Sequence, residues 1–139
     1  MSAFNPGRAI VAGLVYFLLV FAAGFALGAV RTLFVAPRLG ETLAVIIELP
    51  LMLAISWIAC GAVLKRIDLP PQIFLRLLMG ACAFAFLMIA EFALAHFAFS
   101  QSIDDFLQAL TRTPGALGLA GQIAFALMPS VRRVKSCEI

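Results

Sequence analysis

The chain has 139 residues, a length that suits one domain, and 64% of them are hydrophobic while only 12% are charged. A soluble domain is about half apolar and about a quarter charged, and one this small has too little interior to bury so much apolar surface, so the mean hydropathy of +1.10 indicates a membrane protein. The net charge of +3 does not indicate a nucleic-acid-binding protein, because the basic residues lie at the ends of apolar runs rather than in a patch.

The first apolar run is long enough to cross a membrane as a helix, which takes about 20 apolar residues. It predicts a helix over about 9–35. A secretory signal sequence has a shorter apolar core of about 7–15 residues, so we expect this helix to be retained. Gly24 and Gly28 form a GxxxG pair, the spacing that lets two membrane helices pack closely.

Two further runs predict spans over about 43–64 and 73–97. Pro-Arg-Leu-Gly at 37–40 and Leu-Pro-Pro at 69–71 are the turn signals that precede them. Arg76 falls in the first turn of the third span, where we expect its side chain to snorkel to the lipid headgroups.

The segment that follows has an amphipathic pattern. Apolar residues recur at helical spacing with polar residues opposite them: Ile103, Phe106, Leu107 and Leu110 against Asp104, Asp105 and Gln108. Ser102 and Asp105 have the spacing of a capping box. These features predict a short helix over about 102–112 that lies on the membrane surface.

The last apolar run, 115–131, is rich in glycine and close to the lower length limit for a span. A re-entrant segment is the alternative, and it needs protein or water around its backbone. We favour a full span, with Thr113 and Pro114 at its start. The predicted fold class is therefore an all-α membrane protein, a single domain over 1–139 with four transmembrane helices and one short interfacial helix.

Lysine and arginine concentrate on the cytoplasmic side of membrane proteins, and here they divide unequally between the two sides. Seven lie on one side and three on the other: Arg8, Lys65, Arg66, Arg76, Arg132, Arg133 and Lys135 against Arg31, Arg38 and Arg112. The N- and C-termini are therefore predicted to be cytoplasmic.

Polar residues inside the predicted spans need partners there. The candidates are Arg31, Glu48, Glu91, His96 and Gln122. Helical rise puts three of them, Glu48, Glu91 and Gln122, roughly 7–10 Å inside the outer ends of their helices. His96 is shallower, but all five fall in the outer half of the bilayer. We expect Arg31, Glu48 and Glu91 to converge in one outer-leaflet cluster, with His96 and Gln122 close by.

Pro50, two residues after Glu48, predicts a break in the second helix that frees a carbonyl near residue 46. Two interpretations of the cluster remain open. The side chains hold the helices together, or they form a proton or cation path or a polar ligand site. Two acids beside one base need a proton or another partner to balance their charge.

Other chemistry is mostly absent from the sequence. Cys60 and Cys82 lie in apolar runs, where a thiol behaves as a small hydrophobe, and Cys137 is expected to be inert. There is no HExxH, no Ser/His/Asp order and no Gly-rich phosphate loop, and a single His excludes a bis-His haem within one chain. We expect no cofactor, no metal and no catalytic site, and we expect the thirteen phenylalanines to face lipid.

The stretch 31–53, RTLFVAPRLGETLAVIIELPLML, resembles small uncharacterised inner-membrane proteins of proteobacteria that share an Arg…Pro-Arg-x-Gly-Glu…Glu-x-Pro pattern. The resemblance covers the first two predicted helices best. It implies a location in the bacterial inner (cell) membrane, and no functional residue, because no activity is attached to those proteins.

The favoured function is that of a non-enzymatic accessory or structural subunit. It would act in the lipid bilayer through a homo-oligomer or another membrane protein. The alternative is a small proton- or cation-linked transport protein that uses the Glu/Arg cluster, and a membrane enzyme is the least favoured of the three.

The charge asymmetry leads to a topology prediction. Reporter fusions after Leu69 and after Lys135 should be cytoplasmic, and a fusion after Ser102 should be external. Paired phosphatase and fluorescent-protein fusions measure this directly. An external reporter at Lys135 would contradict the four-span orientation.

Overall fold

The structure, a computed structural model, describes residues 4–133. Its four long apolar segments have the length and composition of membrane spans: Pro6–Leu39, Glu41–Ile67, Ile73–Phe99 and Thr113–Val131. The first comprises α1 (Pro6–Val30), a π-helical segment η1 (Arg31–Val35) and α2 (Ala36–Leu39). The others are α3 (Glu41–Ile67), α4 (Ile73–Phe99) and α6 (Thr113–Val131), and α5 (Ile103–Thr111) is a shorter helix between the last two. The predicted fold class is confirmed, and the chain is a multi-pass membrane protein.

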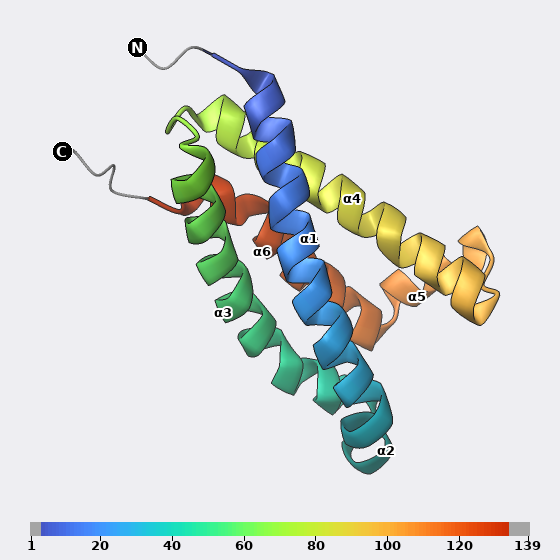
Figure 1. Cartoon of the computed structure of the whole chain (residues 1–139). Helices are drawn as coiled ribbons and strands as arrows, with labels where there is room; N and C mark the ends of the chain where they lie inside the picture. The colour runs from blue at the N-terminus through green and yellow to red at the C-terminus, as the bar shows by residue number, and fades with distance from the viewer. Residues whose placement is uncertain (1–3, 134–139) are drawn as a thin grey trace.

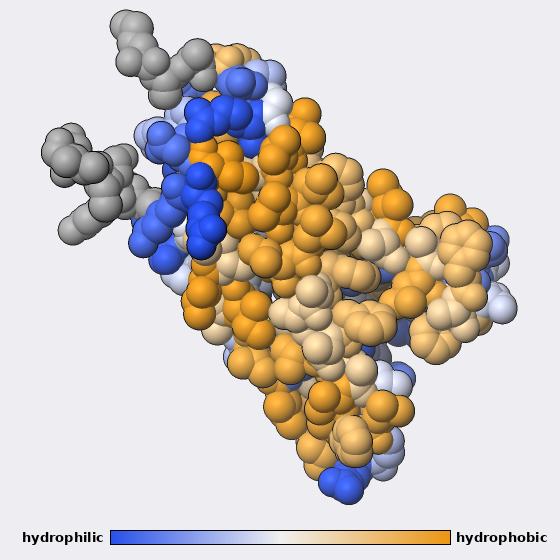
Figure 2. Space-filling view, viewed as in Figure 1, coloured by the Kyte–Doolittle hydropathy of each residue, from blue (hydrophilic) through white to orange (hydrophobic). Residues whose placement is uncertain are grey.

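The long helices alternate in direction and form a ring in which α1 and α6 each pack on both α3 and α4 (Figure 1). The start of α1 and the end of α6 lie at the same end of the molecule, which we call the terminal end. At the opposite, splayed end, α4 diverges from α1 and α3 (Figure 1). Figure 2 shows polar residues gathered towards the ends and a broad apolar surface between them, as a membrane requires.

The first span continues further than its sequence predicts. The chain turns only at Gly40, whose φ of +83° is a left-handed conformation that favours glycine. Pro37 has no N–H for the carbonyl four residues before it. The backbone widens just ahead of this proline, where the N–H of Ala36 bonds to the carbonyl of Arg31, and so the helix passes through the proline as a π turn.

The predicted break at Pro50 is wrong, because α3 runs through it without interruption. Pro50 is exposed on the outer side of the bundle. The helix loses one backbone hydrogen bond at this proline and continues. The last span is likewise one unbroken helix of 19 residues, roughly 28 Å long by helical rise, as full spanning requires.

The short helix α5 has the predicted capping box. The Ser102 hydroxyl accepts a hydrogen bond from the Asp105 N–H at 3.2 Å, and the Asp105 carboxylate accepts one from the Ser102 N–H at 3.3 Å. Phe106 packs edge-on against Phe92 of α4, with ring centroids 5.5 Å apart. Ile103 remains 60% exposed, so α5 turns one part of its apolar face to the bundle and leaves the other part uncovered.

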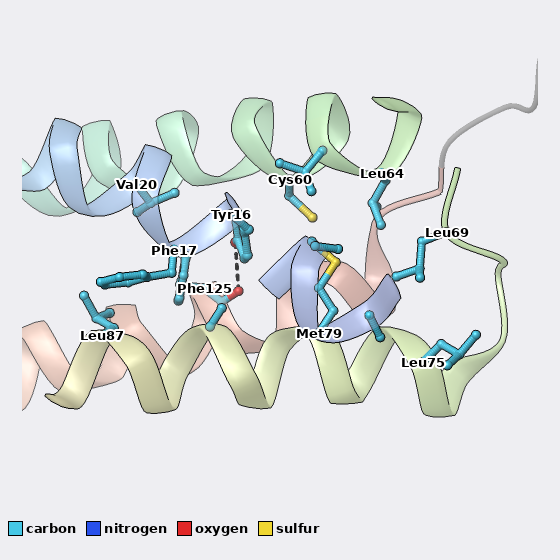
Figure 3. Packing of buried hydrophobic residues seen from close by; sticks show 14 residues of the cluster. Tyr16, Phe17, Val20, Cys60, Leu64, Leu69, Leu75, Met79, Leu87 and Phe125 are labelled. Carbon is cyan, nitrogen blue, oxygen red and sulfur yellow. Dashed lines mark hydrogen bonds between the residues drawn. The ribbon is translucent and has the colours of Figure 1, made fainter. Parts of the chain in front are cut away.

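The buried core occupies the terminal half of the bundle (Figure 3). Tyr16 of α1 crosses the ring to α6, where its ring stacks on Phe125 with centroids 4.3 Å apart. Its hydroxyl donates a hydrogen bond of 2.9 Å to the Phe125 carbonyl (Figure 3). Pro129, four residues further along α6, has no N–H to offer that carbonyl. The tyrosine therefore replaces a hydrogen bond that the proline removes from the helix.

Arg76 does not snorkel to the headgroups as predicted, because its side chain turns into the bundle and is only 7% exposed. It donates four hydrogen bonds of 3.1–3.3 Å, to the carbonyls of Leu69, Pro70, Pro129 and Arg132. Carbonyls in a link and at the end of a helix have no backbone N–H of the helix to bond with. The Arg76 guanidinium donates hydrogen bonds to these carbonyls instead. Arg76 thereby joins the α3–α4 link to the end of α6.

Helices α4 and α6 pack closely at Gly80, a glycine outside the GxxxG pair identified in the sequence. A Cβ at Gly80 would clash with the carbonyl of Ala126, so α4 and α6 approach each other there as closely as their backbones allow. Cys60 is fully buried in the core, as expected of a small hydrophobe. Cys137 and Lys135 lie outside the described residues.

The Tyr16 hydroxyl can be tested by a one-atom deletion. Tyr16→Phe keeps the ring but leaves the buried Phe125 carbonyl without a donor, and should lower the free energy of unfolding by about 1–3 kcal/mol. Pro129→Ala restores a backbone N–H, so Tyr16→Phe should have a smaller effect in that background. Denaturation with sodium dodecyl sulfate in mixed micelles measures the cycle. An equal effect in both backgrounds would contradict the compensation.

Candidate functional site

The splayed end contains a cavity of about 730 Å³ lined by residues of all four spans. Its floor is the edge of the core: Val20, Ser56, Leu87 and Phe125 line the cavity and are at most 7% exposed. Figure 2 shows the surface hollowed between the two diverging arms of the molecule. The cavity therefore begins where the core ends and opens away from the terminal end.

Most of the cavity wall is apolar, and aromatic rings contribute to it from three helices. Phe21 and Phe25 come from α1, Phe99 from α4 and Phe125 from α6. The expectation that all the phenylalanines face lipid is wrong for Phe125, which is buried. Phe17 also departs from it, because it is buried in the core.

An ion pair crosses this wall between the first two spans. Arg31 Nη1 lies 3.0 Å from Glu48 Oε2, and the two side chains are 36% and 15% exposed. No N–H points along the line to that oxygen, so the contact is an ion pair rather than an aligned hydrogen bond. Arg31 is the first residue of η1, and π-helical turns are frequent at functional sites.

Glu91 and Gln122 form a second polar pair between α4 and α6. Gln122 Nε2 donates a hydrogen bond of 2.6 Å to Glu91 Oε1. Glu91 lines the cavity and Gln122 lies behind it. Gln122 Oε1 is buried and receives no hydrogen bond from any residue in 4–133. An amide turned by 180° would present this oxygen instead, and the oxygen could accept a hydrogen bond from the O–H of a neutral Glu91.

Arg31 also borders a smaller cavity of about 250 Å³, nearer the surface, which Glu41 and Pro114 line. Thr32, Val45 and Gly118 border both cavities. Arg31 thus lines both the smaller, outer cavity and the larger, inner one, whereas Glu48 lines only the inner cavity.

Two of the predicted site residues lie elsewhere. His96 does not line either cavity, and its Nδ1 lies 2.9 Å from the Gln101 carbonyl oxygen at the end of α4. Its ring stacks on Phe92. A histidine in the last turn interacts favourably with the helix dipole, which accounts for its position without any role in a cluster. Pro50 lies on the outer side of α3, as described above.

Two cavity glycines have no packing reason among residues 4–133. A Cβ at Gly28 of α1 or at Gly118 of α6 would meet no atom within 4 Å, and both residues line the cavity. The predicted GxxxG pair therefore makes no close helix contact at Gly28. These positions keep the inner space wide.

The site combines two carboxyl groups with one guanidinium in largely apolar surroundings. No group of three or more possible metal ligands occurs in the described part of the chain. Glu91 has no cationic side chain within 4.0 Å among residues 4–133. The arrangement can therefore accept a proton or an external positive charge at Glu91.

The sequence contains one further signal for this site. Gly24, Gly28 and Arg31 are spaced four and three residues apart, so they share one face of α1. That spacing places the two glycines beside the polar cluster rather than at a separate helix contact. The aromatic contribution had no comparable signal, because phenylalanine is frequent on every side of these helices.

No family model, characterised protein or solved structure matches this chain.

The ion pair leads to an asymmetric mutational prediction. Arg31→Ala leaves the half-buried Glu48 carboxylate without its cation and should lower the free energy of unfolding by about 1–2 kcal/mol. Glu48→Gln should have an effect below about 0.5 kcal/mol, because a neutral amide needs no cation. Arg38→Ala, at an exposed arginine of α2, is the matched control. A larger effect for Glu48→Gln than for Arg31→Ala would contradict this account.

Proposed function

We propose that this chain is a small cation-linked transport protein of the bacterial inner membrane, which takes up a proton or another cation at Glu91. The main support is the position of this carboxyl group, at the wall of a large cavity and without a cationic partner among residues 4–133. Ionisable groups within membrane spans are costly to keep there and are functional candidates for that reason. If the Glu91–Gln122 pair served only to hold the helices together, side chains would be expected to fill the space beside it.

The Gln122 amide supports exchange at Glu91. In its present orientation it donates to a carboxylate, and in the reversed orientation it would accept from a carboxylic acid. Gln122 can thus form a hydrogen bond of similar energy with either protonation state of Glu91. Gln122 offers this adaptability without contributing any charge of its own.

The cavity favours a carrier over a channel. Its floor is closed by the core, in which Tyr16 and Met79 are fully buried, so the cavity does not extend to the terminal end. Passage to the terminal end would require that the core opens. We propose that the termini are cytoplasmic, in accord with the distribution of lysine and arginine, and that the cavity faces outward. The resemblance of residues 31–53 to proteobacterial inner-membrane proteins agrees with this location.

A non-enzymatic accessory role is the second candidate, and the exposure of α6 favours it. Only 11% of the most apolar window of α6 is buried within the chain. A span with so little of its surface buried offers a packing surface to a second copy of the chain or to another membrane protein. In this case the polar cluster would serve to hold the four helices together.

Labelling with dicyclohexylcarbodiimide tests the proposed function, because this apolar reagent reacts with protonated carboxyl groups that it reaches within membranes. Glu91 should be modified in native membranes, as mass spectrometry of the purified protein would detect. Asp104, an exposed acid on α5, should not be modified under the same conditions. Glu91→Gln should remove the label, while Asp104→Asn should leave it unchanged.

Absence of label from Glu91 in folded protein would overturn the proposal. A carboxyl group that neither takes up a proton nor can be reached from the membrane cannot exchange a cation there. The accessory role would then be the better account of the cluster.

A further inference from the structure

The charge balance of the inner cavity favours a positive occupant. Glu48 and Glu91 both line it, and Arg31 is the only basic residue among 4–133 that does. Arg31 already lies 3.0 Å from Glu48, so Glu91 is the carboxyl group of this cavity that has no ion-pair partner within 4.0 Å among residues 4–133. A ligand that carries one positive charge would balance it.

The surroundings of Glu91 do not suit a bare metal ion. Such an ion needs several oxygen, nitrogen or sulfur ligands, and no cluster of three possible ligand residues exists within 4–133. The wall around Glu91 offers Leu87, Leu94 and Phe125 instead. These side chains solvate an apolar body, and aromatic rings attract an organic cation through their π faces.

The size and the glycines of the cavity agree with such a body. About 730 Å³ lies within the range of sites for drug-sized molecules, roughly 300–1,000 Å³. Gly28 and Gly118 bring bare helix backbone to the wall from α1 and α6, and no atom of residues 4–133 fills the space beside them. A bulky ligand can therefore approach both helices closely.

We infer that the cavity binds an amphiphilic organic cation, whose charge lies near Glu91 and whose apolar body lies against Gly28 and Gly118. This inference rests on the proposed function and specifies its ligand class.

Two ions of nearly equal size and shape test the charge preference. The full chain in phosphatidylcholine nanodiscs is dialysed against tetraphenylphosphonium, a cation, or tetraphenylborate, an anion, with empty nanodiscs as the blank. We expect saturable binding of the cation alone. Glu91→Gln should weaken it at least tenfold, while Asp104→Asn should not change it.

Blocking variants test the position of the apolar body. Gly118→Leu should abolish binding of tetraphenylphosphonium because its side chain fills the cavity. Ala120→Leu, two residues away on the exposed side of α6, should leave binding unchanged. Gly28→Leu repeats the test from α1 in case the first variant does not fold, which gel filtration and thermal unfolding would reveal.

Several outcomes would overturn the inference. Equal binding of the anion would mean that the cavity selects apolar bulk without regard to charge. Full binding in Glu91→Gln, or in folded Gly118→Leu and Gly28→Leu, would place the cation elsewhere. Loss of binding when phosphatidylethanolamine replaces phosphatidylcholine in the nanodiscs would identify phosphatidylethanolamine as the occupant. If carbodiimide modifies Glu91 but the cation does not bind, this inference fails and the proposed function stands.

Discussion

The hydrogen bond from Tyr16 to the Phe125 carbonyl is the interaction on which the rest of the bundle depends. It joins α1 and α6, which lie across the ring and share no direct backbone contact. In a membrane the apolar side chains gain little by meeting each other rather than lipid, so a buried polar contact and close packing must hold the helices. The carbonyl is available because Pro129 cannot donate to it, and a proline in α6 thus creates the acceptor that α1 requires.

This contact also divides the molecule into two halves. Towards the terminal end, the core is filled and Arg76 joins the α3–α4 link to the end of α6. Towards the splayed end, Phe125 is the floor of the cavity, and α4 diverges from α1 and α3 (Figure 1). The closed half supplies the stability that an open half lacks, so the cavity can remain wide without a filled interior of its own.

The sequence predicted the elements well because hydrophobic length alone defines a membrane span. It predicted side-chain directions poorly, because these depend on which helices become neighbours. Arg76 was expected at the headgroups because long basic side chains tend to snorkel there. Its side chain instead turns into the bundle and donates hydrogen bonds to nearby carbonyls that have no other donor. The matched depths of the acids were visible in the sequence, whereas the pairing of Arg31 with Glu48 and of Glu91 with Gln122 required the order of helices around the ring. His96 was expected nearby at a shallower depth, but its ring nitrogen bonds to the Gln101 carbonyl just after the end of its own helix.

The two acids differ in a way that separates structure from function. Glu48 has a permanent cation beside it, and this pair accounts for its presence in the membrane. Glu91 has only a neutral amide, and a glutamine at 91 would form an equally good hydrogen bond with Gln122 without a charge to bury. An amide could therefore fill the structural role of the Glu91 carboxyl group. The presence of a carboxyl group at this position is explained by its ability to gain and lose charge. That ability is useful at this position because Glu91, unlike Gln122 behind it, reaches the cavity.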